Sequence, residues 1–368
     1  MMENIFVLLV GLLLAAFMGQ SIIPRILVIS LRKRLFDVPD ERKVHKRPIP
    51  RLGGVSFFPV ILFVFCLLTA YRIVKGHFPN EMFSVNFVTE MLGMFAGLTL
   101  LYLIGISDDL VGVRYRTKFR IQIISSAFFP LSGLYINDFY GLLGIHAVTP
   151  WIGIPLTMLL VVFVTNAINL IDGIDGLASS ICIVALSMLG VIFAISSLWL
   201  YAQLAFAAVG VLIPFFLYNV FGNADRGRKI FMGDTGSLTL GYILSFLVIK
   251  YCMYLGPENV QSSGAPIVIA FSILLVPCLD VIRVVLGRIR RKAHPFHPDR
   301  THFHHKFIDM GFSPRNSLIL IQFISTCFIV GTVVTIYVGV DANIVLALDV
   351  IIWTVLNIWF TKVISKRS

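Results

Sequence analysis

Eleven apolar stretches, each long enough to cross a lipid bilayer, constrain the fold of this sequence more than any other feature. A membrane-spanning helix needs about 20 mostly apolar residues. Only 13% of the residues are charged, whereas soluble domains contain about 25%. The sequence therefore predicts an all-α polytopic membrane protein with about eleven transmembrane helices in one integral domain, residues 1–368. The stretches cover residues 4–31, 53–71, 90–107, 119–136, 151–169, 177–196, 199–219, 236–255, 264–287, 317–338 and 341–362.

The distribution of positive charge predicts the orientation. All but five of the 30 Lys and Arg residues lie in segments 32–52, 108–120, 220–233 and 288–316 and in the C-terminal tail. Because positive residues stay on the cytoplasmic side, we expect a multi-pass protein of the cytoplasmic membrane with its N-terminus outside and its C-terminus inside. The net charge of +11 fits inner loops that contact anionic membrane lipid. No motif supports binding of nucleic acid.

Five polar motifs fall on the predicted cytoplasmic side. A channel or transporter would need polar groups through the bilayer to its midplane, but these motifs stop at one face. This one-sided pattern favours an enzyme that works at the cytoplasmic membrane surface, with a transporter or lipid flippase as the alternative from another class. The motifs are DVPDERKVHKRPIPRLGG (37–54), SDDLVGVRYRTK (107–118), NAINLIDGIDGLA (166–178), RKIFMGDTGSL (228–238) and HPFHPDRTHFHH (294–305).

The motif at 166–178 contains two amides and two carboxylates at a spacing of three. Neighbouring pairs would lie on adjacent turns of a helix, but a regular helix would rotate the first away from the last. Gly173 and Gly176 offer a break that could turn all four toward one site. The alternative is a polar loop that only joins two spans. The four residues are Asn166, Asn169, Asp172 and Asp175.

Two further acidic positions lie at the ends of spans. Adjacent Asp108 and Asp109 repel each other and need a cation, a shared proton or water; the alternative is a solvated turn. Lys118 begins the next span, where its ammonium group could meet a phosphate. Asp234 lies at an expected helix start, which suits a carboxylate or a phosphate, although an ordinary N-cap gives the same pattern. Phe231 could stack on a base or lie in the lipid interface.

The last inner segment contains five of the eight histidines. Two of them, His302 and His305, have the spacing of zinc ligands, but no other residues complete a tetrahedral set. Phosphate contact or proton transfer is the favoured interpretation, with a solvated loop as the alternative. Asp280 and Arg283, three residues apart near the end of a span, predict a local ion pair.

The residue types suit phosphoryl transfer. Carboxylate and amide oxygens are the ligands of Mg²⁺, and Lys, Arg and His suit phosphate oxygens. Phosphoryl transfer needs both, because the protein mainly positions its reactants and neutralises charge. No P-loop or kinase signature is present, which argues against a donor of the ATP-kinase type. A polytopic enzyme also implies a lipid reactant that enters between the helices.

These motifs resemble those of the polyprenyl-phosphate N-acetylhexosamine-1-phosphate transferases, the superfamily that includes the MraY, WecA and TagO types. The matches occur in the order of the family from residue 37 to 305, and they imply an MraY-like fold. The sequence PFHPDRTHFHH and the basic RGRK before FMGD most resemble the WecA type. The MraY type is expected to have three adjacent histidines, which this chain lacks. The segment 220–229 is longer than in the MraY pattern, which leaves the place of Asn219 at the nucleotide open.

The resemblance implies roles for individual residues. Asp234 and Asn169 are similar to Mg²⁺ ligands, with Mn²⁺ as an alternative metal, and Asp108 is similar to a base or orienting group for the lipid phosphate. The expected catalytic residues are Asp108, Asp109, Asp172, Asp175 and His302. The expected substrate-binding residues are Lys118, Asn166, Gly173, Ile174, Asp175, Phe231, Arg300, His304, His305, His45 and Arg51.

The resemblance also implies the reaction. Undecaprenyl phosphate or another polyprenyl phosphate would attack the β-phosphorus of a UDP-N-acetylhexosamine and release UMP on the cytoplasmic face. UDP-GlcNAc is the expected donor, in a first membrane step of cell-envelope glycan synthesis. Another UDP-N-acetylhexosamine is the alternative, because no residue visibly selects the sugar. A homodimer is compatible with the resemblance, and the sequence leaves the oligomeric state open.

Overall fold

The protein is an all-α polytopic membrane protein. The structure, a computed structural model, describes residues 1–36, 49–76, 79, 84–254, 264–294 and 301–365, and in this part ten helices are long and apolar enough to cross a membrane. The helices are α1 (Met2–Lys33), α2 (Phe57–Val74), α3 (Val85–Val111), α4 (Tyr115–Leu131), α5 (Pro150–Ile171), α6 (Leu177–Ile195), α7 (Trp199–Val220), α8 (Gly233–Tyr254), α9 (Ala265–Arg290), α10 (Phe303–Asp309), α11 (Pro314–Tyr337) and α12 (Ala342–Ser365). Short 3₁₀ turns are η1 (Gly53–Ser56), η3 (Leu142–Gly144) and η4 (Ala224–Arg226).

Among the described residues, ten helices meet the criteria for a span, whereas the sequence predicts about eleven. The remaining predicted span, 119–136, corresponds to α4, which has only 17 residues and ends at Leu131. Its first turns carry Arg116, Lys118 and Arg120. A spanning helix needs at least about 17 residues, so α4 is at the lower limit of length and its beginning is polar.

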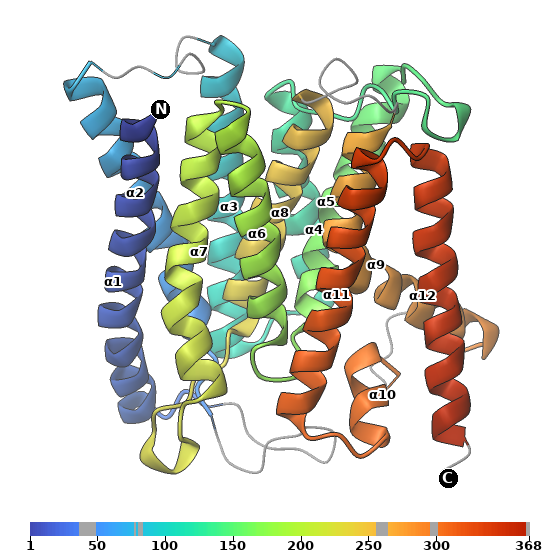
Figure 1. Cartoon of the computed structure of the whole chain (residues 1–368). Helices are drawn as coiled ribbons and strands as arrows, with labels where there is room; N and C mark the ends of the chain where they lie inside the picture. Colours follow the sequence, from blue (N-terminus) through green and yellow to red (C-terminus); the bar gives the residue numbers. More distant parts are fainter. Residues whose placement is uncertain (37–48, 77–78, 80–83, 255–263, 295–300, 366–368) are drawn as a thin grey trace.

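The long helices lie side by side, and the two termini lie at opposite ends of the bundle (Figure 1). The ends of α3, α5 and α7 and the beginnings of α4, α6, α8 and α11 all lie toward the end of the bundle where α12 ends (Figure 1). The short helix α10 lies at this same end, in contact with α11 and α12. The chain order therefore brings the described parts of the polar motifs to one end, as predicted.

Helix α8 lies in the interior of the bundle, against α3, α5 and α6. In its most apolar part, 89% of the residues are buried, compared with 28% in α1 and in α12. Two glycines permit a close approach at the beginning of α8. A β-carbon on Gly105 of α3 would lie 2.6 Å from the Cα atom of Thr235, and one on Gly54 of η1 would lie 2.1 Å from the Cα atom of Gly236. Small residues let helix backbones meet in this way.

Candidate active site

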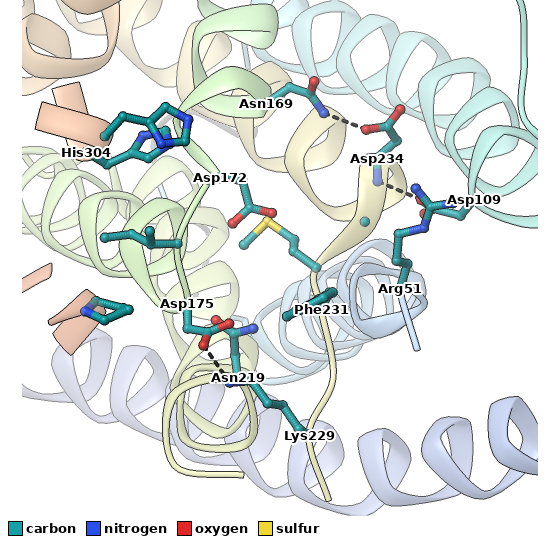
Figure 2. A pocket seen from close by; sticks show the side chains of 16 residues that line it. Arg51, Asp109, Asn169, Asp172, Asp175, Asn219, Lys229, Phe231, Asp234 and His304 are labelled. Atoms are coloured by element: carbon teal, nitrogen blue, oxygen red, sulfur yellow. Dashed lines mark hydrogen bonds and ion pairs between the residues drawn. The ribbon is translucent and has the colours of Figure 1, made fainter. Parts of the chain in front are cut away.

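A pocket opens at the end of the bundle that contains the polar motifs. Its volume is about 560 Å³, within the usual range for a small-molecule site. Figure 2 shows that its polar side chains come from several helix ends and face a common space. The lining residues are Arg51, Asp109, Asn169, Asp172, Gly173, Ile174, Asp175, Asn219, Lys229, Phe231, Met232, Gly233, Asp234, His304, His305 and Pro314.

Asp109 joins the end of α3 to the beginning of α8. Its Oδ1 atom accepts a hydrogen bond from the backbone N–H of Asp234 at 2.8 Å, and its Oδ2 atom accepts from the N–H of Thr235 at 3.0 Å and from the Thr235 hydroxyl at 2.6 Å. The first N–H groups of a helix have no partner within the helix. A carboxylate from another helix therefore caps α8, which leaves the side chain of Asp234 available to the pocket.

The Asp234 carboxylate lies among polar partners from three helices. Asn169 of α5 donates from Nδ2 to Oδ1 of Asp234 at 2.7 Å and to the hydroxyl of Ser237, also at 2.7 Å. Lys118 of α4 pairs with Oδ2 of Asp234 and lies 3.5 Å from Oδ2 of Asp108. One ammonium group thus connects two carboxylates that the sequence places 126 positions apart, so charge balance here depends on residues from different helices.

The motif at 166–178 is broken between two helices. Helix α5 ends at Ile171 and α6 begins at Leu177, with Gly176 in the left-handed region at φ 81°. Glycine adopts this conformation without the steric cost of a β-carbon. The Asn219 side chain stabilises the break, because its Oδ1 atom accepts from the N–H of Gly176 at 2.6 Å while its Nδ2 atom donates to the carbonyl of Ile230 at 2.8 Å. Asn219 therefore lines the pocket, although the sequence leaves its position open.

The two aspartates of the break have different surroundings. Burial, followed by the negative charges of Asp175, Asp234 and Asp109, raises the pKa of Asp172 to about 7. Asp175 forms an ion pair with Lys229, with 2.5 Å between Nζ and Oδ2. Lys229 lies in the motif at 228–238 but is not among the predicted site residues, because its partner Asp175 lies in another motif. Its side chain faces the pocket together with Phe231 (Figure 2).

The histidines of α10 form another side of the pocket. His304 and His305 line it, whereas His302 is buried beside Asp280 of α9 and is not among the lining residues. Burial lowers the pKa of His304 to about 3, with His305 as the next contribution, so its imidazole is neutral at physiological pH. The ring lies against Gly173, where a β-carbon would be 2.1 Å from the His304 Nε2 atom.

Several predicted site residues lie away from the pocket lining. Asp108 accepts from the N–H of Val113 at 2.6 Å at the end of α3. Asn166 is one turn before Asn169 and exchanges hydrogen bonds with Gln122 of α4. Its side chain is thus engaged in helix packing. The predicted substrate-binding residues His45 and Arg300 lie outside the described residues.

The comparison with known proteins decides the family. The family described as "Glycosyl transferase family 4" matches residues 91–252. The chain is 30% identical to a Bacillus subtilis (strain 168) protein named "Probable undecaprenyl-phosphate N-acetylglucosaminyl 1-phosphate transferase", over 90% of this chain and 86% of that protein. The chain belongs to glycosyl transferase family 4.

Two other relatives support the assignment. Both are named "Undecaprenyl-phosphate alpha-N-acetylglucosaminyl 1-phosphate transferase". The protein from Yersinia pestis is 30% identical over 80% of this chain and 74% of its own length. The protein from Escherichia coli (strain K12) is 29% identical over 78% of this chain and 72% of its own length. The resemblance stated from the motifs is thereby confirmed.

The donor groups of this family-4 pocket fit a divalent cation that is shared with a substrate. In the part of the chain that the structure describes, no three His, Cys, Asp or Glu side chains form a metal cluster by themselves. Mg²⁺ usually binds through one or two carboxylates together with substrate phosphates. Asp234 and the amide oxygen of Asn169 supply such a partial set. The pKa of Asp172 is raised mainly by burial and next by the neighbouring carboxylates, whose negative charge a cation would offset.

Proposed function

We propose that this family member transfers GlcNAc-1-phosphate from UDP-GlcNAc to undecaprenyl phosphate and releases UMP. The observation that carries the proposal is the pocket itself. Four carboxylates and two amides converge there with cationic and histidine side chains from separate helix ends. The names of the relatives indicate both the acceptor and the transferred sugar. The reaction would occur at the cytoplasmic face of the cell membrane, in keeping with the positive loops at this end.

The reaction joins two negatively charged groups, so charge is the main barrier. An oxygen of the lipid phosphate forms a bond to the β-phosphorus of UDP-GlcNAc, and the bond from that phosphorus to the oxygen of UMP breaks with its electron pair. Asp234 and Asn169 would hold Mg²⁺ or Mn²⁺, which neutralises charge on the diphosphate when bound. The protein otherwise acts by positioning its reactants.

The residues that line the pocket and those directly behind Asp234 have different proposed tasks. Lys118, which bridges Asp108 and Asp234, supplies positive charge for the lipid phosphate. Asp108 orients that phosphate or accepts its proton. Phe231 offers a ring for the uracil base, and the break at 173–175 surrounds the nucleotide. The neutral His304 can donate or accept one hydrogen bond without adding charge.

The test is a transfer assay with purified protein, undecaprenyl phosphate, Mg²⁺ and UDP-GlcNAc labelled in the sugar. We expect UMP release together with label in the lipid extract, and loss of both in EDTA. UDP-GalNAc and other UDP-N-acetylhexosamines in parallel tubes test the donor, because another preferred sugar would replace GlcNAc in the proposal. Absence of UMP release with every donor would contradict transferase activity and favour transport of a lipid or nucleotide.

A further inference from the structure

A buried carboxylate on α9 holds the beginning of α10. Asp280 is 1% exposed, and a carboxylate at such depth in a membrane protein is costly unless it is paired. It accepts from His302 Nδ1 at 2.9 Å, from the backbone N–H of Phe303 at 3.0 Å and from Arg283 at 2.6 Å. Arg283 also donates to the carbonyl of Thr301 at 2.5 Å. The predicted Asp280–Arg283 ion pair is present, and its two side chains also form hydrogen bonds with the consecutive residues 301–303.

The Asp280 carboxylate determines the tautomer of His302. A carboxylate accepts hydrogen bonds only, so the 2.9 Å contact assigns the imidazole proton to Nδ1. Arg283 lies 2.6 Å from the other carboxylate oxygen and balances its charge. A carboxylate behind an imidazole fixes both its proton and its orientation. His302 is therefore held in one position although it does not line the pocket.

The His302 ring is connected to the pocket through the ring of His304. The His302 and His304 rings are parallel within 6°, with 5.9 Å between their centroids, and the His304 and His305 centroids are 4.2 Å apart. The Nδ1 atom of His304 is buried and has no hydrogen-bond partner among the residues that the structure describes. Ring packing rather than a side-chain hydrogen bond at Nδ1 thus sets the orientation of His304 against Gly173.

Helix α10 has a second and separate anchor. Phe303 packs against Trp353 of α12 with 4.8 Å between ring centroids, and Phe307 packs against Phe360 at 5.0 Å. Lys306 donates to the backbone carbonyl and the side chain of Asn357, each at 3.2 Å. These contacts do not involve Asp280, so α10 can stay attached to α12 when the Asp280 carboxylate is changed. The Asp280 carboxylate therefore orients His302, and the attachment of α10 to the rest of the protein does not depend on it alone.

We propose that Asp280 is a positioning residue for the nucleotide side of the pocket: it orients His302, which orients His304 against Gly173. This inference rests on the proposed function, because it assigns the histidine wall to the binding of UDP-GlcNAc. Asp280 touches no reactant and acts through the histidine rings. Its loss affects binding of the donor more than the chemical step.

The first test is Asp280→Asn, which keeps the size of the side chain but places an N–H donor or a weaker acceptor against His302. The KM for UDP-GlcNAc is expected to rise about tenfold, the lower end of the effect seen when the carboxylate behind a metal-binding histidine is lost. The kcat and the KM for undecaprenyl phosphate change less than about threefold on the same reasoning. Asp349→Asn is the matched control, since Asp349 is also buried and bonds to Thr332 at 2.7 Å on other helices.

A second variant separates positioning from folding. His302→Asn keeps an N–H donor for Asp280 but removes the ring that packs on His304. We expect it to unfold near the wild-type temperature and to raise the donor KM as Asp280→Asn does. The donor KM of the double variant is expected to be no higher than that of either single variant, because both changes break the same series of contacts from Asp280 through His302 to His304. If Asp280→Asn fails to fold, the donor KM of His302→Asn alone tests the positioning role.

The outcomes are distinct. A wild-type donor KM in His302→Asn, or fully additive effects in the double variant, would overturn the positioning role. An equal rise of donor KM in Asp349→Asn would also overturn it, because the effect would then belong to any buried carboxylate. If the wild-type protein releases no UMP, the proposed function is wrong and this inference falls with it.

Discussion

The adjacent aspartates Asp108 and Asp109 offer a sharp test, because the same substitution is expected to have different structural consequences. Asp109 accepts three hydrogen bonds at the beginning of α8. Asparagine has only one acceptor oxygen, so Asp109→Asn sets an N–H group against at least one of these donors. Hydrogen bonds to charged groups contribute about 1.5–3 kcal/mol each, and a buried unpaired group costs a similar amount. We expect Asp109→Asn to lose about 3 kcal/mol of unfolding free energy.

Asp108→Asn is the matched variant. Asp108 accepts one backbone hydrogen bond, from Val113, which the asparagine oxygen can keep. Its ion pair with Lys118 is 3.5 Å long and partly exposed, and such pairs contribute about 1 kcal/mol or less. The expected loss of unfolding free energy is therefore about a third of that for Asp109→Asn. Both variants are expected to lose UMP release, since both carboxylates lie beside Asp234.

Thermal unfolding in detergent, followed by the fluorescence of the four tryptophans, measures the difference. With about 2 °C per kcal/mol for a chain of this size, Asp109→Asn should melt about 6 °C lower than wild type and Asp108→Asn about 2 °C lower. Equal melting temperatures for the two variants would refute the assignment of Asp109 as the cap of α8. A larger loss in Asp108→Asn would reverse the structural argument.

Three further predictions concern the pocket and its orientation. Gly173→Ala should lower kcat/KM by about 5- to 150-fold, because overpacking costs about 1–3 kcal/mol and a β-carbon would lie 2.1 Å from the adjacent histidine ring. Gly331→Ala, with no atom within 4 Å of its β-carbon, should keep wild-type activity. Burial, followed by neighbouring carboxylates, raises the pKa of Asp172 to about 7 in the folded protein. The folded state therefore favours the protonated carboxyl group, which contributes fully to stability below the unfolded pKa, and this contribution is lost as pH rises through 7. In EDTA, the melting temperature of Asp172→Asn should therefore exceed that of wild type increasingly from pH 5 to pH 8, and a constant difference would contradict the shift. Single cysteines at the exposed positions Lys292 and His146 test the orientation. With a membrane-impermeant thiol reagent, a cysteine at position 146 should react when the reagent is outside the cell, and a cysteine at position 292 should react only when the reagent reaches the inner face. The reverse pattern would overturn the orientation.

The fold was largely predictable because each span is a local property of the sequence. Apolar length alone indicates a membrane helix, and the described helices follow the predicted stretches. The exception is α4, where three basic residues occupy the first turns. The break at Gly173 and Gly176 was also predictable, since glycine marks positions where a helix can end.

The partners of the polar residues were not predictable in the same way. Lys229 pairs with Asp175 across 54 positions, and no local pattern distinguishes it from other loop lysines. His302 was expected among the catalytic groups, but Asp280 of another helix holds it behind the pocket. Such pairs depend on which helix ends meet, which a single sequence does not contain.

We propose that the pocket around Asp234 performs the transfer. The most direct measurement is UMP release from UDP-GlcNAc with undecaprenyl phosphate and Mg²⁺, by wild type and by Asp234→Asn side by side. We expect wild type to release UMP only when the lipid phosphate is present. We expect Asp234→Asn to release UMP at least about 100-fold more slowly, as when a residue that stabilises the transition state is removed. UMP release at the wild-type rate by a folded Asp234→Asn protein would contradict it.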